Sequence, residues 1–329
     1  MFRAILTVSF MATTAMLHAD EDSELRAFAA ATGSTYVPKD KNGKDQTTPR
    51  LELHDSVKDA ELVKLAAIKP IALKSLQMKS CDKITPKGFA TLGVMPALTH
   101  LTFRHQFDDD FFAKLPKQVP NLEELWVEGS LAKAPGPTPV GVAKLAACTK
   151  LKTLTFFSIG FNDEIWAALA KIPTLEEVVI AFGDVGDVKG VGIKQLAACK
   201  RFVKLTFLVT PLSEQGFREI SELSSLTHLT FEETGLQDRN VAKLAALKEL
   251  THLNIEKEKL TDAALKPVAA MPKLTYLMLT KIAVTDLGMV NLTGAKSLRE
   301  VRLNFTRVTP AGIERLKRLL PEADIQKSK

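Results

Sequence analysis

Two histidines could coordinate a metal ion, because they occupy the same place in neighbouring copies of a repeated segment. His228 lies in LTHLTFEETGLQD and His252 in LTHLNIEKEKLTD, 24 residues further along. Equivalent positions on adjacent strands lie about 4.8 Å apart at the backbone, and Glu232 and Glu256 follow in the same two segments. Zn²⁺ normally requires at least three protein ligands, and Lys204 flanks the pair on one side. We expect a surface histidine pair, with a weak metal site as the alternative.

The three cysteines are the next candidates for chemistry. Cys148 and Cys199 each end an LAAC segment, at a place that Ile, Leu or Met fills in other copies of the repeat, so we expect both in the core. They are two repeats apart, so their backbones are separated by about 10 Å or more, and a disulfide cannot bridge more than about 7 Å. Cys81 falls at a turn, where it could make local hydrogen bonds. We predict no disulfide, no metal site and no nucleophile among the three.

The sequence lacks the common catalytic motifs. It contains no Gly-rich phosphate loop, no G-x-S-x-G turn and no H-E-x-x-H pair. Its acidic pairs, such as Glu123-Glu124 and Glu176-Glu177, are adjacent in sequence, and adjacent residues of a strand point to opposite faces. We therefore predict no catalytic residues and no cofactor, and a chain that is not an enzyme.

Charge and the first residues bear on partners and location. The chain has 44 basic and 38 acidic residues, which are interleaved, so no basic stripe indicates nucleic-acid binding. Residues 1–19 resemble a signal peptide, with Arg3, an apolar run from Ala4 to Met16, and the exit Leu17-His18-Ala19. The run is shorter than the roughly 20 residues that span a bilayer. We expect an exported protein, periplasmic or secreted, without a membrane span.

A repeat must position all of these residues. Units of the form L-x-x-L-x-L begin at Leu226, Leu250, Leu274 and Leu298, and further starts fall at 73, 98, 122, 151, 175 and 202. A fixed period of this length indicates a solenoid, in which no unit buries its apolar face alone. The alternating opening predicts a strand, and a second apolar set at spacing three predicts a short helix. One such helical set comprises Trp166, Leu169 and Ile172.

This pattern resembles the leucine-rich repeat. Val284-Thr285-Asp286-Leu287-Gly288 is similar to the T-D-x-G subtype of exported bacterial proteins, and LKSLQMKSCDKITPKGFATL at 73–92 is similar to the cysteine-containing subtype of F-box proteins. The resemblance implies an α/β solenoid, a horseshoe with a parallel sheet of about 11 strands on the concave face and short helices on the convex face. The ninth position, usually Asn, Thr or Cys in this family, departs from the pattern at Ile159, Gly183, Glu258 and Ile282, which argues against a continuous side-chain ladder there.

The repeats divide the chain into four parts. After the signal peptide of residues 1–19, we predict an N-terminal cap of a short helix and a hairpin at 20–50. Leucine-rich repeats then occupy 51–321, and a C-terminal cap and tail occupy 322–329. The cap is expected because the first strand would otherwise expose unpaired backbone groups.

The candidate binding surface is a patch of large apolar residues at outward positions of four successive strands. Two irregular units accompany it, with extra residues near 131–141 and 183–191. Aromatic anchors beside charged groups are typical of a binding patch, although the two loops could instead cover the aromatics, or the register could be mistaken. The apolar members are Trp126, Phe157, Val179, Phe182, Leu208 and Val209, and the charged neighbours are Glu124, Glu177 and Lys204.

These observations favour a non-catalytic, exported protein-interaction module that uses its concave face. We expect a protein partner, with a glycan as a further option, and a monomeric chain. The F-box resemblance leaves open a substrate-recognition subunit of an enzyme complex. A structural or surface-assembly protein is the other alternative.

Overall fold

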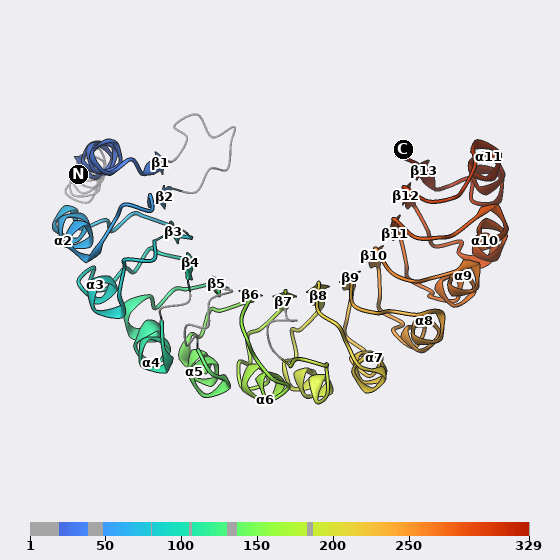
Figure 1. Ribbon diagram of the computed structural model, residues 1–329, viewed down its shortest axis with the longest axis horizontal. Helices are drawn as coiled ribbons and strands as arrows, with labels where there is room; N and C mark the ends of the chain where they lie inside the picture. Colours follow the sequence, from blue (N-terminus) through green and yellow to red (C-terminus); the bar gives the residue numbers. More distant parts are fainter. Residues whose placement is uncertain are drawn as a thin grey trace, which may run out of the picture. The chain divides into compact units, whose positions relative to one another are not determined.

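The computed structural model describes residues 20–38, 49–79, 81–104, 107–129, 137–182 and 187–328. The chain forms two compact units, each of which is described by itself. The first comprises residues 1–137 and 147–151, and the second comprises 138–146 and 152–329. Within each unit the strands lie along one side and the helices along the other (Figure 1). We call the face of the sheet turned away from the helices the open face.

The first unit begins with a helical segment at 20–32. Its β1 and β2 form the antiparallel hairpin that the sequence predicts for the cap, and β2 to β5 run parallel. Its elements are β1 (Thr35–Val37), β2 (Arg50–Glu52), α2 (Asp59–Ile68), β3 (Ser75–Met78), α3 (Pro86–Ala90), β4 (His100–Arg104), α4 (Asp109–Gln118) and β5 (Glu124–Glu128).

The second unit repeats strand and short helix from β6 to β13, and its neighbouring strands pair in parallel. Its elements are α5 (Pro139–Lys144), β6 (Thr153–Phe157), α6 (Ile165–Leu169), β7 (Glu177–Ala181), η3 (Ile193–Ala198), β8 (Lys204–Leu208), α7 (Glu214–Ile220), β9 (His228–Glu232), α8 (Asp238–Leu244), β10 (His252–Glu256), η4 (Asp262–Ala264), α9 (Leu265–Ala269), β11 (Tyr276–Thr280), α10 (Asp286–Asn291), η5 (Leu292–Gly294), β12 (Glu300–Asn304), α11 (Pro310–Leu319) and β13 (Asp324–Gln326). The turn η1 (Leu145–Ala147) follows α5.

The described residues form thirteen strands, and within each unit the strands follow sequence order in the sheet. The expected strands, about 11, are those of the repeats, and the two further strands are β1 and β13 at the ends. Both are three residues long, and each pairs with the neighbouring repeat strand, which would otherwise present an unpaired edge.

The core lies between the sheet and the helices. The inward strand positions and the spaced-by-three helix positions are buried, as the periodicity predicts, and Trp166, Leu169 and Ile172 are each 0% exposed. Cys148 and Cys199 are buried with free thiols, which confirms their core assignment. Cys81 is also buried, and its thiol lies 3.3 Å from the carbonyl of His54, so its hydrogen bond reaches the preceding repeat.

The Thr-Asp-x-Gly motif couples successive repeats on the helix side. Thr285 caps α10, and it also donates its backbone N–H and hydroxyl to the two carboxylate oxygens of Asp262, at 2.7 and 2.6 Å. A methyl group on Gly288 would overlap Asp262 Oδ1, so the glycine leaves room for the aspartate of the preceding repeat. The same Thr-to-Asp pair of hydrogen bonds joins Thr85 to Asp59, Thr261 to Asp238, and Thr309 to Asp286.

One irregular repeat replaces this carboxylate with backbone. Ser213 donates both its N–H and its hydroxyl to the carbonyl of Lys189, each at 2.9 Å. Gly216 makes room for that carbonyl as Gly288 does for an aspartate. The loop is held in turn by Asp163, whose Oδ1 accepts from the N–H groups of Lys189 and Gly190 at 2.9 and 2.8 Å. The longer loop thus preserves the repeat-to-repeat bonding.

Glu258 holds the loop of the preceding repeat. Glu258 is 6% exposed, and its carboxylate accepts hydrogen bonds from the Thr234 N–H and hydroxyl and from the N–H groups of Gly235 and Leu236. Burial raises the pKa of Glu258, and these donors oppose the rise by stabilising the charged form. Two other ninth positions, Ile159 and Ile282, are buried apolar side chains. The departures from the family pattern therefore use packing or a carboxylate to hold this part of the repeat.

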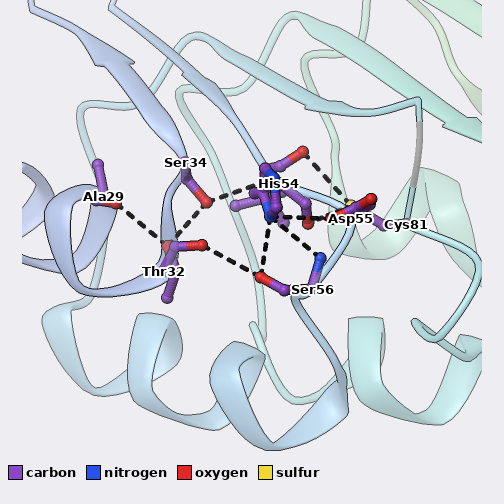
Figure 2. Close-up of polar contacts among 8 residues, drawn as sticks. Ala29, Thr32, Ser34, His54, Asp55, Ser56 and Cys81 are labelled. Atoms are coloured by element: carbon purple, nitrogen blue, oxygen red, sulfur yellow. Dashed lines mark hydrogen bonds and ion pairs between the residues drawn. The ribbon is translucent and has the colours of Figure 1, made fainter.

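A hydroxyl and imidazole cluster ties the helical segment 20–32 to the first repeat (Figure 2). Thr32 Oγ1 donates to Ser34 Oγ at 2.7 Å, and Ser34 Oγ accepts from the backbone N–H of His54 at 3.1 Å. Ser56 Oγ lies 3.0 Å from His54 Nδ1 and donates to the carbonyl of Thr32 at 3.2 Å. The cluster closes the cap against the end of β2.

The role of Gly288 can be tested by substitution. Gly288→Ala should lower the free energy of unfolding by about 1–3 kcal/mol, because the added methyl overlaps Asp262 and strains a packed contact. Gly294→Ala is the matched control, since its methyl would meet Ala269 Cβ no closer than 4.0 Å. Urea unfolding of the two variants measures both effects. Equal stability of the two variants would contradict the assignment.

The hydrogen bonds that Glu258 accepts from the loop at 234–236 lead to a second prediction. In Glu258→Gln the amide NH₂ faces buried donors whichever way it turns, so stability should fall by about 1–3 kcal/mol. Glu233→Gln, on the same loop, removes an exposed ion pair with Lys257 and should cost under about 1 kcal/mol. Thermal unfolding at pH 7 compares the stability of the two variants. A Glu258→Gln variant as stable as its control would refute the stabilising role of these hydrogen bonds.

Candidate binding surface

The open face of the second unit carries an apolar cluster on β6 to β8. Phe157 and Phe182 are in contact, with ring centroids 4.8 Å apart and planes at 53°. Val179 lies on β7 and Leu208 on β8, and both are half-buried, while Phe182 is 37% exposed. Together with the half-buried Val209, these five residues form what we call the phenylalanine patch.

Backbone conformation singles out two members of the patch. Phe182 and Val209 follow their strands with φ of 54° and 48°, in the left-handed region. This conformation recurs in the repeat, where the N–H of each such residue donates to the next strand, so the fold imposes it. Left-handed backbone is unfavourable for bulky residues and most unfavourable for β-branched ones such as valine. Phe182 and Val209 are therefore bulky residues at positions where the fold imposes an unfavourable backbone conformation.

The charged residues beside the patch pair across strands. Glu177 and Lys204 are register partners on β7 and β8, with 3.9 Å between Oε2 and Nζ. Both side chains remain partly exposed. The pair therefore forms a polar border along one side of the phenylalanine patch.

Trp126 and Glu124, which the sequence groups with the patch, belong to β5 of the first unit. The ammonium of Lys79 lies 5.1 Å from the centre of the Trp126 ring, a cation–π contact. Glu124 approaches His100, its register partner on β4. Parts of the predicted covering loops, at 130–136 and 183–186, lie outside the described residues, so the question of whether they cover the aromatics stays open.

His228 and His252 stack on the open face, with ring centroids 4.1 Å apart and planes at 10°. Tyr276 continues the stack at 5.4 Å, and the guanidinium of Arg302 lies 5.8 Å from the tyrosine ring. We call these four residues the aromatic row. Sequence reasoning did not single out Tyr276 or Arg302. The tyrosine could have been found, because in LTYLML it occupies the position that His228 and His252 occupy in their repeats.

The threonine hydroxyls bear on the tautomer of both histidines. Thr227 Oγ1 lies 3.2 Å from the carbonyl of Val203 and 2.8 Å from Nδ1 of His228. Because a hydroxyl has one proton, we infer that Thr227 donates it to the carbonyl and accepts the Nδ1–H of His228. Thr251 holds His252 in the same way, at 2.9 Å. The lone pairs of both rings are therefore on Nε2, and they run side by side. Burial, followed by the charge interactions with His252 and Lys204, lowers the pKa of His228 below its usual value.

This geometry does not favour the weak metal site. Zinc binds imidazole nitrogen at about 2.0–2.1 Å, so two nitrogens as far apart as these rings would place the ion on the line between them. The lone pairs do not point along that line. Among the described residues, no group of three or more His, Cys, Asp or Glu side chains is placed to hold a metal.

His100 has a different neighbour. It also meets the hydroxyl of the preceding threonine, Thr99, through Nδ1 at 2.8 Å, but its Nε2 lies 3.3 Å from Glu124 Oε1. The hydrogen bond with Glu124 raises the pKa of His100, against the opposing effect of burial. The same Leu-Thr-His-Leu sequence therefore holds a histidine of raised pKa in one place and of lowered pKa in another.

The cluster of His54, Asp55 and Ser56 contains the residue types of a catalytic triad but lacks its arrangement. In a triad the serine contacts one ring nitrogen and the acid the other. Here both Ser56 Oγ, at 3.0 Å, and Asp55 Oδ1, at 2.9 Å, approach Nδ1 of His54. The cluster therefore has the geometry of a structural tie (Figure 2).

An open hollow of about 720 Å³ lies between the helical segment 20–32 and α2 in the first unit. Its polar groups bind one another, because Glu61 accepts from the backbone N–H of Lys58 and pairs with Lys64.

In the part of the chain that the structure describes, no helix is long and apolar enough to cross a membrane.

Comparison with solved structures identifies the fold. An internalin (InlF) of Listeria monocytogenes superposes with a TM-score of 0.51 at 15% identity, covering 94% of this chain and 91% of that one. A chain of the Rad7 and Elc1 complex in yeast gives 0.50 at 19%, covering 98% and 84%. The TLR13–ssRNA13 complex gives 0.51 at 14%, covering 77% of this chain and 38% of that one.

These likenesses confirm the predicted leucine-rich-repeat solenoid, an α/β fold. No protein-family model and no curated protein matches the sequence. The T-D-x-G and cysteine-containing subtypes remain predictions.

The ion pair of His100 predicts a pH dependence. A histidine whose pKa is raised by folding adds stability that is fully present below about pH 6.5 and is lost as pH rises through the raised pKa. Glu124→Gln should therefore lower the pKa of His100, and its stability deficit should be largest near pH 5.5 and shrink by pH 8. NMR titration of the ring and urea unfolding at both pH values measure the two effects. Lys79→Gln, which leaves the ion pair intact, is the control, and an unchanged pKa of His100 would contradict the pairing.

Proposed function

We propose that this chain is a non-catalytic, exported protein-interaction module that binds a protein partner on the open face of its second unit. Leucine-rich-repeat folds are typically non-catalytic binding scaffolds, and the phenylalanine patch provides this one with an apolar anchor. Export is proposed from the composition of residues 1–19, which lie outside the described residues.

The observation that carries the proposal is the contact between Phe157 and Phe182 on an open sheet face. Interfaces take most of their affinity from a few large, rigid side chains that a partner covers. The left-handed backbone at Phe182 and Val209 supports the same conclusion, since the fold holds bulky residues where smaller ones would be less strained. Glu177 and Lys204 provide a polar border of the kind that surrounds such anchors.

The proposal is tested by replacing the two rings. Phe157→Ala with Phe182→Ala should weaken binding to the captured partner by at least thirtyfold, equivalent to about 2 kcal/mol, because both anchors are lost. The partner is first captured with the wild-type chain from extracellular and periplasmic fractions of the native host, identified by mass spectrometry and purified. Calorimetry then gives the affinities of wild type and variant.

Two controls accompany this measurement. Leu287→Ala removes a side chain that is 74% exposed on α10, on the helix side, and should leave the affinity unchanged. Trp126→Ala tests separately whether the first unit takes part. Full affinity in the double phenylalanine variant would refute the patch as the binding site.

A further inference from the structure

In the first unit, a histidine of the repeat already binds a carboxylate. In Leu98-Thr99-His100-Leu101 the threonine hydroxyl holds Nδ1 of His100, and Nε2 faces the carboxylate of Glu124 at 3.3 Å. Glu124 is the register partner of His100 on the next strand. A Thr-His pair on this repeat therefore presents Nε2 outward, toward the position where a carboxylate binds it.

The second unit has the Thr-His pair on two adjacent strands. There, the register partner on the next strand, which is Glu124 in the first unit, is not an acidic residue. The register partner that follows His228 is His252, and the one that follows His252 is Tyr276. Both rings are held through Nδ1 in the same way as His100, so their Nε2 atoms present the same hydrogen-bonding edge. The intramolecular acid of the first unit is replaced here by a second imidazole and a phenol.

We propose that His228 and His252 form a binding site for a carboxylate side chain of a protein partner, and that the site takes up protons when the partner binds. The inference rests on the proposed function, because it names the chemistry of a partner. Aspartate and glutamate side chains of an acidic segment are the groups that it would receive.

The geometry of the pair suits a carboxylate. Because Nδ1–H of each ring is committed to a threonine, an added proton goes to Nε2. Protonation thus creates two parallel donors separated by about the ring spacing of 4.1 Å. One carboxylate, with its two oxygens, can accept from both, as charge-assisted hydrogen bonds. In the neutral state the same edge presents two lone pairs, which repel an anion.

The charged groups around the pair set the direction of the pH dependence. Lys204 on β8 flanks His228 and pairs with Glu177 on β7, and Arg302 on β12 lies over Tyr276 and pairs with Glu300. Glu232 and Glu256, at the far ends of β9 and β10, lie toward Lys257 and Lys281.

Protonating both rings places two positive charges side by side near Lys204, which is unfavourable without an anion. A bound carboxylate removes that penalty. Binding therefore strengthens as pH falls, as long as the ligand stays ionised.

The test uses the full chain and a capped peptide of alternating glutamate and glycine, with the glutamine analogue as the neutral control. Calorimetry at pH 5.5 and 7.5, in buffers of different ionisation enthalpy, measures affinity and proton uptake. One coupled proton gives about a tenfold change in affinity per pH unit. We expect the glutamate peptide to bind at least tenfold more tightly at pH 5.5, with net proton uptake, and the glutamine peptide to bind at neither pH.

Variants locate the site. His228→Asn and His252→Asn should each remove most of the pH dependence, whereas His100→Asn, whose ring already faces Glu124, should retain it. Ring NMR of the wild-type chain gives a readout that does not depend on a variant folding, because the pKa of His228 should rise when the peptide is added. Equal affinity at the two pH values, or pH dependence that survives both substitutions, would overturn the proposal.

This test can be separated from that of the proposed function. The Phe157→Ala and Phe182→Ala variant should bind the glutamate peptide as the wild type does, since neither ring belongs to the histidine pair. Loss of the natural partner with unchanged peptide binding supports both assignments, and peptide binding abolished by the phenylalanine substitutions would count against the histidine site.

Discussion

The fold depends on the contact between one repeat and the next, because no single repeat can bury its own apolar face. The contact has an apolar part, in which strand and helix residues of neighbouring repeats share one core. It also has a polar part, in which the threonine caps Thr85, Thr261, Thr285 and Thr309 bond to an aspartate of the repeat before them. The first supplies most of the free energy, and the second sets the spacing between helices. A fixed spacing on the helix side keeps the strands in register on the other side.

Register is what turns this scaffold into a surface for recognition. Each open-face position faces its equivalent on the adjacent strand, so side chains far apart in sequence become neighbours at the strand spacing. Glu177 beside Lys204, and His228 beside His252, arise in this way. A repeat that changes one residue at such a position changes the local chemistry without disturbing the core. The irregular loop at 187–190 also preserves the register. There, the backbone carbonyl of Lys189 takes the place of the aspartate carboxylate of other repeats, and Asp163 holds the loop.

The sequence predicted those features that follow from periodicity. The inward positions, the short helices and the core cysteines all follow from a repeat that can be counted. It did not predict contacts between unlike positions of neighbouring repeats. The bonds from the loop at 234–236 to Glu258, and the room that Gly288 leaves for Asp262, require knowing which atoms face each other across a repeat boundary. β1 and β13 lie outside the repeat count because they lack the repeat motif and form by pairing with strands that have it.

In the candidate sites too, the repeat predicts the position of a side chain, but the residues beside it determine its chemistry. The repeat register grouped Trp126 with the phenylalanines as an outward strand residue, and the structure assigns it to the first unit, beside Lys79. The three Leu-Thr-His-Leu segments are nearly identical in sequence, and threonine fixes their rings alike. What differs is the residue at the next strand, which is an acid after His100 and an imidazole after His228. The hydrogen bond with Glu124 raises the pKa of His100, whereas burial, with a further contribution from His252, lowers the pKa of His228. A single repeated motif therefore produces opposite protonation behaviour.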